Sequence, residues 1–180
     1  MSTPTGTGST NGDVDPTLLG NAPMGEVTVA GDTLQIVFRR HLRAPIEKVW
    51  AALTTPERLA DWFANAEVDL RVGGILRLDG NGMRQNEMRI TICDPPRTFA
   101  WAWKIGSRET LVRFDLKPEA AGCELTLTHS GVPIMAAAAR AGWHALLEAL
   151  PDAVEGRATS WEVKQARETA LRALYPNLQA

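Results

Sequence analysis

Alternating apolar and polar residues from Thr33 onward are typical of a β-strand with one buried face. Leu34, Ile36 and Phe38 occupy every second position of this segment. Successive side chains of a strand point to opposite faces, so these three residues share one face. The pattern predicts the first strand of a sheet.

Helical spacing replaces the alternation after Pro45. This proline suits a first helical turn, because its missing N–H would be unpaired there anyway. Thr55 followed by Pro56 repeats the start signal, with the threonine as N-cap. We therefore expect two short helices in succession. Their apolar positions are Ile46, Val49, Trp50 and Leu53 in the first and Leu59, Trp62 and Phe63 in the second.

Beyond Glu67 the chain divides into short alternating segments separated by turn residues, which favours an antiparallel meander. The turns are predicted at Gly73-Gly74, Asp79-Gly80-Asn81-Gly82, Asp94-Pro95-Pro96, Gly106-Ser107 and Ala121-Gly122. The apolar positions are Met88, Ile90, Ile92, Phe99, Trp101, Trp103, Val112, Phe114, Leu116, Cys123, Leu125 and Leu127. Each strand has one apolar face, as expected for a sheet covered on one side.

The C-terminal third favours helices. Ile134 to Leu150 is rich in alanine and leucine, which predicts a long helix that Pro151 ends. Thr159 and Glu162 have capping-box spacing before a second apolar stripe that ends near Tyr175. The sequence leaves open whether this last helix packs on its own domain or on a second subunit in a homodimer.

The order of strand, two short helices, further strands and long helix predicts an α+β helix-grip fold. We expect a curved antiparallel sheet of about six or seven strands wrapped around the long helix. Residues 1–25 are rich in Ser, Thr, Gly and Pro, which predicts a disordered tail. Residues 26–153 would form the helix-grip domain and residues 154–180 a C-terminal helical extension.

Several ordered motifs carry a family resemblance. They are Arg40-His-Leu-Arg-Ala-Pro45, Val49-Trp50, Leu53-Thr-Thr-Pro56, Trp62-Phe63, Asp69-Leu-Arg-Val-Gly-Gly74, Asp94-Pro-Pro-Arg97, Leu127-Thr-His-Ser-Gly-Val-Pro133 and Gly142-Trp143. Together they resemble the START-like proteins related to the activator of heat-shock-protein-90 ATPase. The resemblance implies a helix-grip fold around an apolar cavity. The wider superfamily includes lipid carriers, hormone receptors, polyketide cyclases and aromatases.

Composition and charge exclude several classes of partner. The formal net charge of -2 gives no electrostatic reason to bind nucleic acid. No apolar run approaches the roughly 20 residues of a membrane span, and no signal-peptide layout precedes the domain, so we expect a cytoplasmic location without membrane contact. Cys93 and Cys123 are expected to be free buried thiols. The chain lacks metal-ligand spacings and nucleotide or nucleophile motifs, so we expect no metal and no cofactor.

Arg40 continues the buried phase of the first strand, and a buried guanidinium needs a partner. Two interpretations follow from the sequence. Arg40 forms a structural ion pair with an acidic residue such as Glu87 or Asp61, or it anchors a carboxylate or phenolate ligand in the cavity.

His129 continues the phase of Leu125 and Leu127, which would aim it into the cavity. It is the one plausible acid or base on the apolar face, so it is the candidate catalytic residue if a reaction occurs. The alternative is a hydrogen-bonded structural histidine at a strand end.

Aromatic side chains supply the remaining candidates for the cavity wall, because indole rings offer flat apolar surfaces and an N–H donor. The candidates are Trp62, Trp101, Trp103, Phe114 and Trp143. We expect the cavity to bind a small apolar molecule, aromatic or lipid-like, with a polar end directed to Arg40 or His129. Two alternatives remain: a cyclase or aromatase acting on polyketide-like compounds, and a chaperone-related interaction domain.

Overall fold

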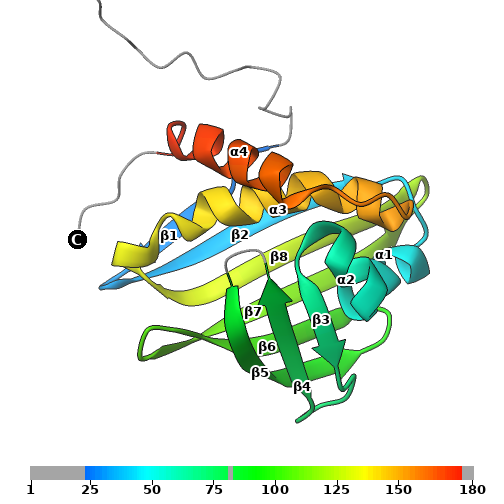
Figure 1. Cartoon of the computed structure of the whole chain (residues 1–180), viewed down its shortest axis with the longest axis horizontal. Helices are drawn as coiled ribbons and strands as arrows, with labels where there is room; N and C mark the ends of the chain where they lie inside the picture. Colours follow the sequence, from blue (N-terminus) through cyan, green and yellow to red (C-terminus); the bar gives the residue numbers. More distant parts are fainter. Residues whose placement is uncertain (1–22, 81–82, 176–180) are drawn as a thin grey trace, which may run out of the picture.

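A curved sheet of eight antiparallel strands dominates the part of the chain that the computed structural model describes, residues 23–80 and 83–175 (Figure 1). The strand order is β1-β2-β8-β7-β6-β5-β4-β3. The strands are β1 (Glu26–Ala30), β2 (Thr33–Leu42), β3 (Asn65–Val68), β4 (Ile75–Gly80), β5 (Met83–Asp94), β6 (Thr98–Ile105), β7 (Arg108–Glu119) and β8 (Gly122–Pro133). The predicted helix-grip sheet is confirmed.

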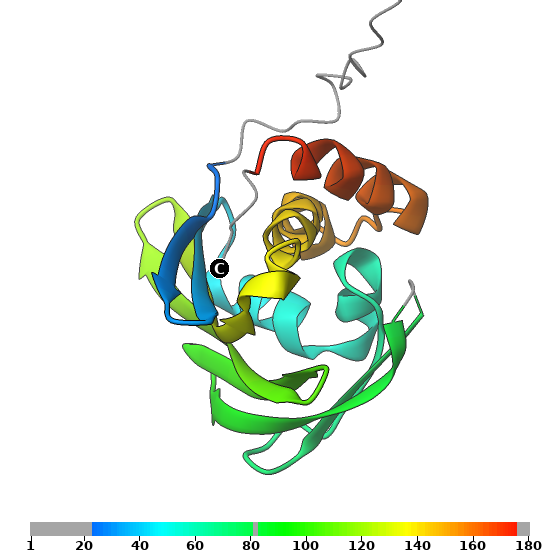
Figure 2. The same ribbon diagram turned by 90° about the vertical axis from the view of Figure 1, so that its left-hand side faces the viewer.

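The helices are α1 (Ile46–Thr54), α2 (Pro56–Trp62), α3 (Ala139–Val154) and α4 (Trp161–Arg172), with a 3₁₀ turn at Ile134–Ala136. Figure 2 shows the sheet curving around α3, with α4 on the side of α3 away from the sheet. The predicted tail lies outside the described residues except for its last three. The predicted turn at residues 79–82 is likewise only partly described.

The sheet has more strands than the sequence predicts because two short ones, β1 and β3, occupy its edges. β1 pairs only with β2 and is mostly exposed, so its residues carry little of the alternation that marks a half-buried strand. The inner faces of the longer strands follow the predicted phase. Ile36, Phe114 and Leu127, for example, are at most 1% exposed.

The long helix differs from its predicted range of Ile134 to Leu150. The 3₁₀ turn occupies the start of that range, and α3 continues for a turn beyond the predicted stop at Pro151. Proline removes one backbone N–H from a helix, but Ala153 and Val154 beyond it are buried in the core. Their packing outweighs the missing hydrogen bond. The helix ends before Gly156, whose φ of 80° suits a glycine.

The N-cap of α4 is Ser160, one residue after the predicted Thr159. The Ser160 hydroxyl accepts a hydrogen bond from the backbone N–H of Val163 at 3.4 Å. The backbone N–H of Thr159 instead donates to the Asp61 carbonyl at 2.9 Å. This hydrogen bond holds Thr159 against the end of α2, and α4 begins one residue later than predicted.

Replacing the cap is expected to weaken α4. We predict that Ser160→Ala lowers the free energy of unfolding by about 1 kcal/mol, because the Val163 N–H loses its acceptor. The matched variant Thr159→Ala should change it by less than about 0.5 kcal/mol. Urea denaturation of both variants measures the difference. A larger loss from Thr159→Ala would contradict the assignment of the cap.

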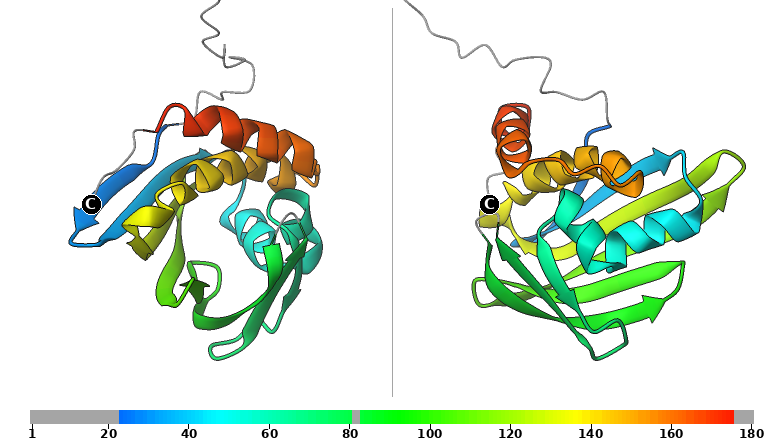
Figure 3. Two further views of the ribbon diagram at one scale, coloured as in Figure 1. Left: turned by 60° about the vertical axis from the view of Figure 1, so that its left-hand side comes forward. Right: turned by 45° about the vertical axis from the view of Figure 1, so that its right-hand side comes forward.

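The last helix packs on its own domain, which answers the question that the sequence left open. The left view of Figure 3 shows α4 next to α3. Ala170 and Leu171 of α4 are buried, and so is Tyr175 just after it. The Tyr175 hydroxyl lies 2.9 Å from His144 Nδ1 on α3 and accepts the backbone N–H of Gly25 at 3.2 Å.

Two remaining expectations concern membranes and thiols. Among the described residues, no helix is long and apolar enough to cross a membrane. Cys93 and Cys123 are free, as predicted; Cys123 is buried and Cys93 half-buried. Burial raises the pKa of both thiols.

Candidate functional site

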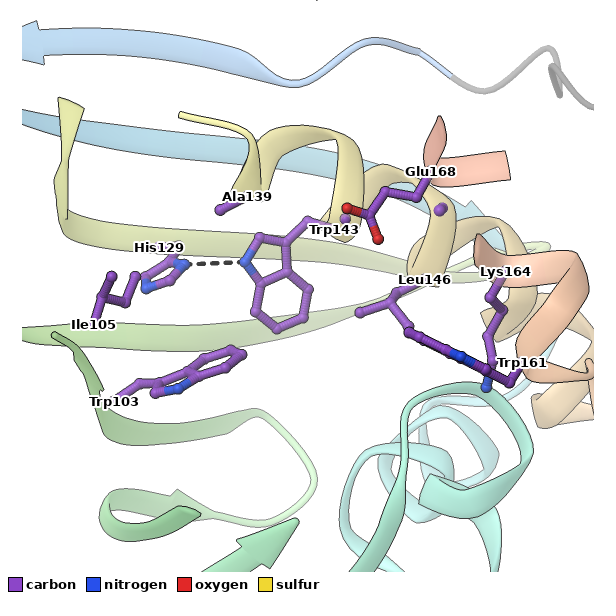
Figure 4. Close-up of a pocket in the computed structure, with 11 residues that line it drawn as sticks. Trp103, Ile105, His129, Ala139, Trp143, Leu146, Trp161, Lys164 and Glu168 are labelled. Carbon is purple, nitrogen blue, oxygen red and sulfur yellow. Dashed lines mark hydrogen bonds between the residues drawn. The ribbon is translucent and has the colours of Figure 1, made fainter. Parts of the chain in front are cut away.

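An apolar cavity of about 190 Å³ lies between the sheet, the start of α3 and the first turns of α4 (Figure 4). From the sheet, β6 contributes Trp103 and Ile105, and β8 contributes His129. From α3, Trp143 and Leu146 reach the cavity. Its surface is carbon almost throughout, so it is suited to an apolar occupant.

The remaining wall combines small residues of α3 with longer ones of α4. Gly142 and Ala145 leave room on the α3 side, where larger side chains would fill the space. Trp161, Lys164 and Glu168 close the α4 side. The cavity therefore depends on the packing of α4 against α3.

A chain of hydrogen bonds fixes the aromatic residues at the sheet end of the cavity. The Trp143 indole N–H donates to His129 Nδ1 at 3.0 Å, the contact drawn in Figure 4. His129 Nε2 lies 2.8 Å from Thr110 Oγ1, and that hydroxyl donates its hydrogen to the Trp103 carbonyl at 2.7 Å. The chain thus links β6, β7, β8 and α3.

This chain determines the tautomer of His129. The Thr110 hydrogen is already donated to a carbonyl, so Thr110 Oγ1 must accept from His129 Nε2–H. Nδ1 is unprotonated because it accepts from Trp143. Both ring nitrogens are occupied in the neutral form. Burial lowers the pKa of His129 from 6.5 to about 4, which is consistent with a neutral ring.

Ring geometry adds to the rigidity of this wall. The Trp103 and His129 rings are stacked, with an interplanar angle of 9° and centroids 5.8 Å apart. Trp143 stands perpendicular to both, at 90° to Trp103 and 86° to His129. A flat ligand would meet preformed aromatic faces with few side-chain rotations left to restrict.

Lys164 is the unusual polar residue of the cavity. It is 3% exposed, and its backbone N–H donates to the Ser160 carbonyl at 3.2 Å, whereas its side chain makes no ion pair or hydrogen bond with the described residues. Burial lowers its pKa, while the charge of Asp61 acts in the opposite direction. Asp61 pairs with Arg58 at 3.6 Å rather than with Lys164. In Figure 4 Lys164 runs from α4 toward Trp161.

The structure brings together three of the predicted site residues, Trp103, His129 and Trp143. The other aromatic candidates, Trp62, Trp101 and Phe114, lie in the packed core and do not line this cavity. The Trp62 indole N–H donates to the Ala52 carbonyl at 2.9 Å. Trp101 and Phe114 pack with ring centroids 5.7 Å apart.

Arg40 is buried, as predicted, but the predicted ion pair is wrong. Glu87 pairs with Arg77 at 2.8 Å, and Asp61 pairs with Arg58. Arg40 lies over the Phe38 ring and donates from Nη1 to the Arg39 carbonyl at 2.9 Å. It does not line the cavity described above. The alternation placed Arg40 on the inner face correctly, but this face is long enough to extend beyond the cavity.

Two functional candidates, Trp161 and Lys164, were missed from the sequence. Both lie on α4, at positions three apart on one helix face. The apolar stripe of that segment was a usable signal, because Trp161 begins it. The sequence does not indicate which element covers this stripe, and the structure shows that α3 does.

A group of side chains with metal-ligand spacing lies elsewhere in the described residues, on the outer end of the sheet. Ligand atoms of His41, Glu119 and Glu124 lie within 4.8 Å of one another. His41 and Glu119 are exposed, and their hydrogen bond of 3.0 Å raises the pKa of the imidazole. Such clusters are common at surfaces without a metal ion.

The sheet, the enclosed helix and the cavity between them define a helix-grip protein. More specifically, the chain belongs to the Activator of Hsp90 ATPase homolog 1-like family, whose model matches residues 43–155. A comparison with curated proteins gives no match.

Solved structures similar to this chain include CalU16 from Micromonospora echinospora, with 29% identity, a TM-score of 0.62, and coverage of 84% of this chain and 94% of that one. EF2215 from Enterococcus faecalis, described as a protein of unknown function, has 22% identity and a TM-score of 0.67. The match covers 83% of this chain and 90% of EF2215. DynU16, described as a putative protein in the dynemicin biosynthetic locus, has 23% identity and a TM-score of 0.62. The match covers 71% of this chain and 48% of DynU16. EF2215 and DynU16 support the fold.

Proposed function

We propose that this protein binds a small apolar molecule of one or two aromatic rings in the cavity between β6, β8, α3 and α4. The observation that carries the proposal is a preformed, carbon-lined cavity with three tryptophans, Trp103, Trp143 and Trp161, in its wall. Empty apolar space of this kind costs stability, and a ligand that fills it recovers dispersion contacts.

The volume favours a small occupant over a lipid chain. A cavity of about 150 Å³ with apolar walls accommodates benzene in another protein, and drug-sized ligands use roughly 300 Å³ or more. The volume here, about 190 Å³, lies between these values. A single ring or two fused rings therefore suit it better than an extended acyl chain.

The two alternatives from the sequence receive less support. A cyclase that used His129 as its base would need a free lone pair, but Trp143 occupies Nδ1 and the other nitrogen carries the proton. A chaperone-type contact through the last helix would need an exposed apolar stripe. The buried positions of that helix, such as Leu171, face the rest of the domain.

Titration with naphthalene tests the proposal. We expect saturable one-to-one binding by calorimetry. In ¹H–¹⁵N spectra the indole N–H signals of Trp103, Trp143 and Trp161 should shift. The signal of Trp62 should not shift, because this residue is buried in the packed core and does not line the cavity. Absence of binding, or equal shifts of all indole signals, would overturn the proposal.

A further inference from the structure

The helix α4 forms one wall of the cavity, but few polar contacts attach it to the rest of the domain. Among the described residues, the side-chain hydrogen bonds of α4 stay within the helix and its cap, as in the pair of Arg172 and Glu168. The ion pair that reaches α3 joins Arg167 Nε to Glu148 Oε2 at 3.9 Å. This distance is too long for a hydrogen bond.

Buried polar atoms without a partner gather where α4 meets α3. Arg167 Nη1, Glu148 Oε1 and His144 Nε2 are all buried, and none has a hydrogen-bond partner among the described residues. His144 Nε2 lies 3.4 Å from Glu148 Oε1, in a geometry that makes no hydrogen bond. Such groups cost stability, because they have lost water and gained nothing in exchange. Movement of α4 away from α3 would return them to water.

The apolar contacts of α4 are incomplete as well. At its first turns the helix borders the cavity, so Trp161 forgoes dispersion contacts on that side. Farther along, Leu171 is 1% exposed and is the residue of α4 that joins the contiguous hydrophobic core of the described residues. Ala170 beside it is buried but small. We therefore expect α4 to separate from α3 at a lower free energy than the whole domain needs to unfold.

We propose that α4 is a movable wall, which leaves α3 by a local opening when the cavity is unoccupied and is held in place by an occupant. This inference rests on the proposed function and adds how occupancy controls the position of the helix. Leu146 of α3 and Trp161 of α4 both border the cavity, so one aromatic ligand would contact both helices (Figure 4). A ligand that binds the docked state alone shifts the equilibrium toward that state.

Amide hydrogen exchange of the full chain tests the opening. Without a ligand, the amides of α4 should be protected at least about a hundredfold less than those of α3. Their exchange should also depend less on urea, because a local opening exposes less surface than global unfolding does. Equal protection and equal urea dependence of the two helices would overturn the proposal.

Naphthalene then tests the effect of an occupant. At a concentration of about a hundred times its dissociation constant, it should slow the exchange of α4 by about a hundredfold, since it stabilises the docked state alone. The control is β1, an edge strand that does not line the cavity. Its exchange should change by less than about threefold.

The variant Leu171→Ala weakens the docking of α4 without altering the cavity wall, which Leu171 does not line. Loss of this buried side chain should speed the exchange of α4 at least about thirtyfold. The affinity for naphthalene should fall at least about threefold, because the open fraction of the protein cannot bind it. Leu174→Ala, at an exposed position just after α4, is the matched control and should change either quantity by less than about twofold. The ¹H–¹⁵N signals of the sheet confirm that each variant is folded.

The outcomes distinguish the two proposals. If calorimetry shows no binding of naphthalene, the proposed ligand-binding function fails, and the coupling of α4 to an occupant fails with it. If naphthalene binds but leaves the exchange of α4 unchanged, or if a folded Leu171→Ala variant keeps the wild-type affinity, the cavity binds aromatic molecules but α4 is a fixed wall.

Discussion

Replacing Ala145 with leucine is expected to reduce the affinity for naphthalene by at least about a hundredfold. Ala145 is 2% exposed and lines the cavity from α3. The leucine side chain adds an isopropyl group at this position, and the remaining space cannot hold two fused rings. Steric exclusion of this kind is difficult to relieve because protein interiors are close-packed.

The same substitution should leave the protein folded. The added carbon enters volume that is empty without a ligand, so we expect the free energy of unfolding to change by less than about 1.5 kcal/mol. Ala166→Leu, at an exposed position of α4, is the matched control and should bind naphthalene as the wild type does. Normal binding by a folded Ala145→Leu variant would place the ligand elsewhere.

Acid is expected to destabilise the protein through His129. Its pKa is about 4 in the folded protein and 6.5 ordinarily, so the unfolded chain binds more protons between these two values. The free energy of unfolding therefore falls as the pH drops from about 6.5 to about 4. The loss amounts to about 3 kcal/mol, since each pKa unit corresponds to about 1.4 kcal/mol.

The variant His129→Gln isolates this contribution. The glutamine oxygen can accept from Trp143 and its amide can donate to Thr110, but the side chain does not titrate. We expect its stability to depend less on pH than that of the wild type between pH 6.5 and 4, as followed by urea denaturation at several pH values. Parallel pH curves for the two proteins would show that His129 does not remain neutral in the folded state.

Local patterns in the sequence predicted most of the secondary structure. Alternation identified the inner faces of β2, β7 and β8, because one buried face imposes a period of two on each strand. Thr55-Pro56 identified the start of α2, because proline is favoured at a first helical position. The edge strands and the exact ends of α3 were missed, since edge exposure and burial in the core override such local signals.

The candidate site was predicted only in part. Alternation could place Trp103 and His129 on the inner face, and helical spacing could place Trp143 toward the sheet. The same rules placed Trp62 and Phe114 inward, although these residues fill the core. Period alone distinguishes the inside of a sheet from its outside, but it carries no information about where space remains unfilled.

The sequence by itself determined the helix-grip architecture, the inner face of each long strand and the apolar character of the interior, because these follow from short-range periodicity and turn chemistry. Only the tertiary structure decided the rest. The packing of α4 on α3 closes the cavity and buries Lys164 within it, and the meeting of β6, β7, β8 and α3 occupies both nitrogens of His129. These contacts join residues distant in the chain, so no local pattern encodes them.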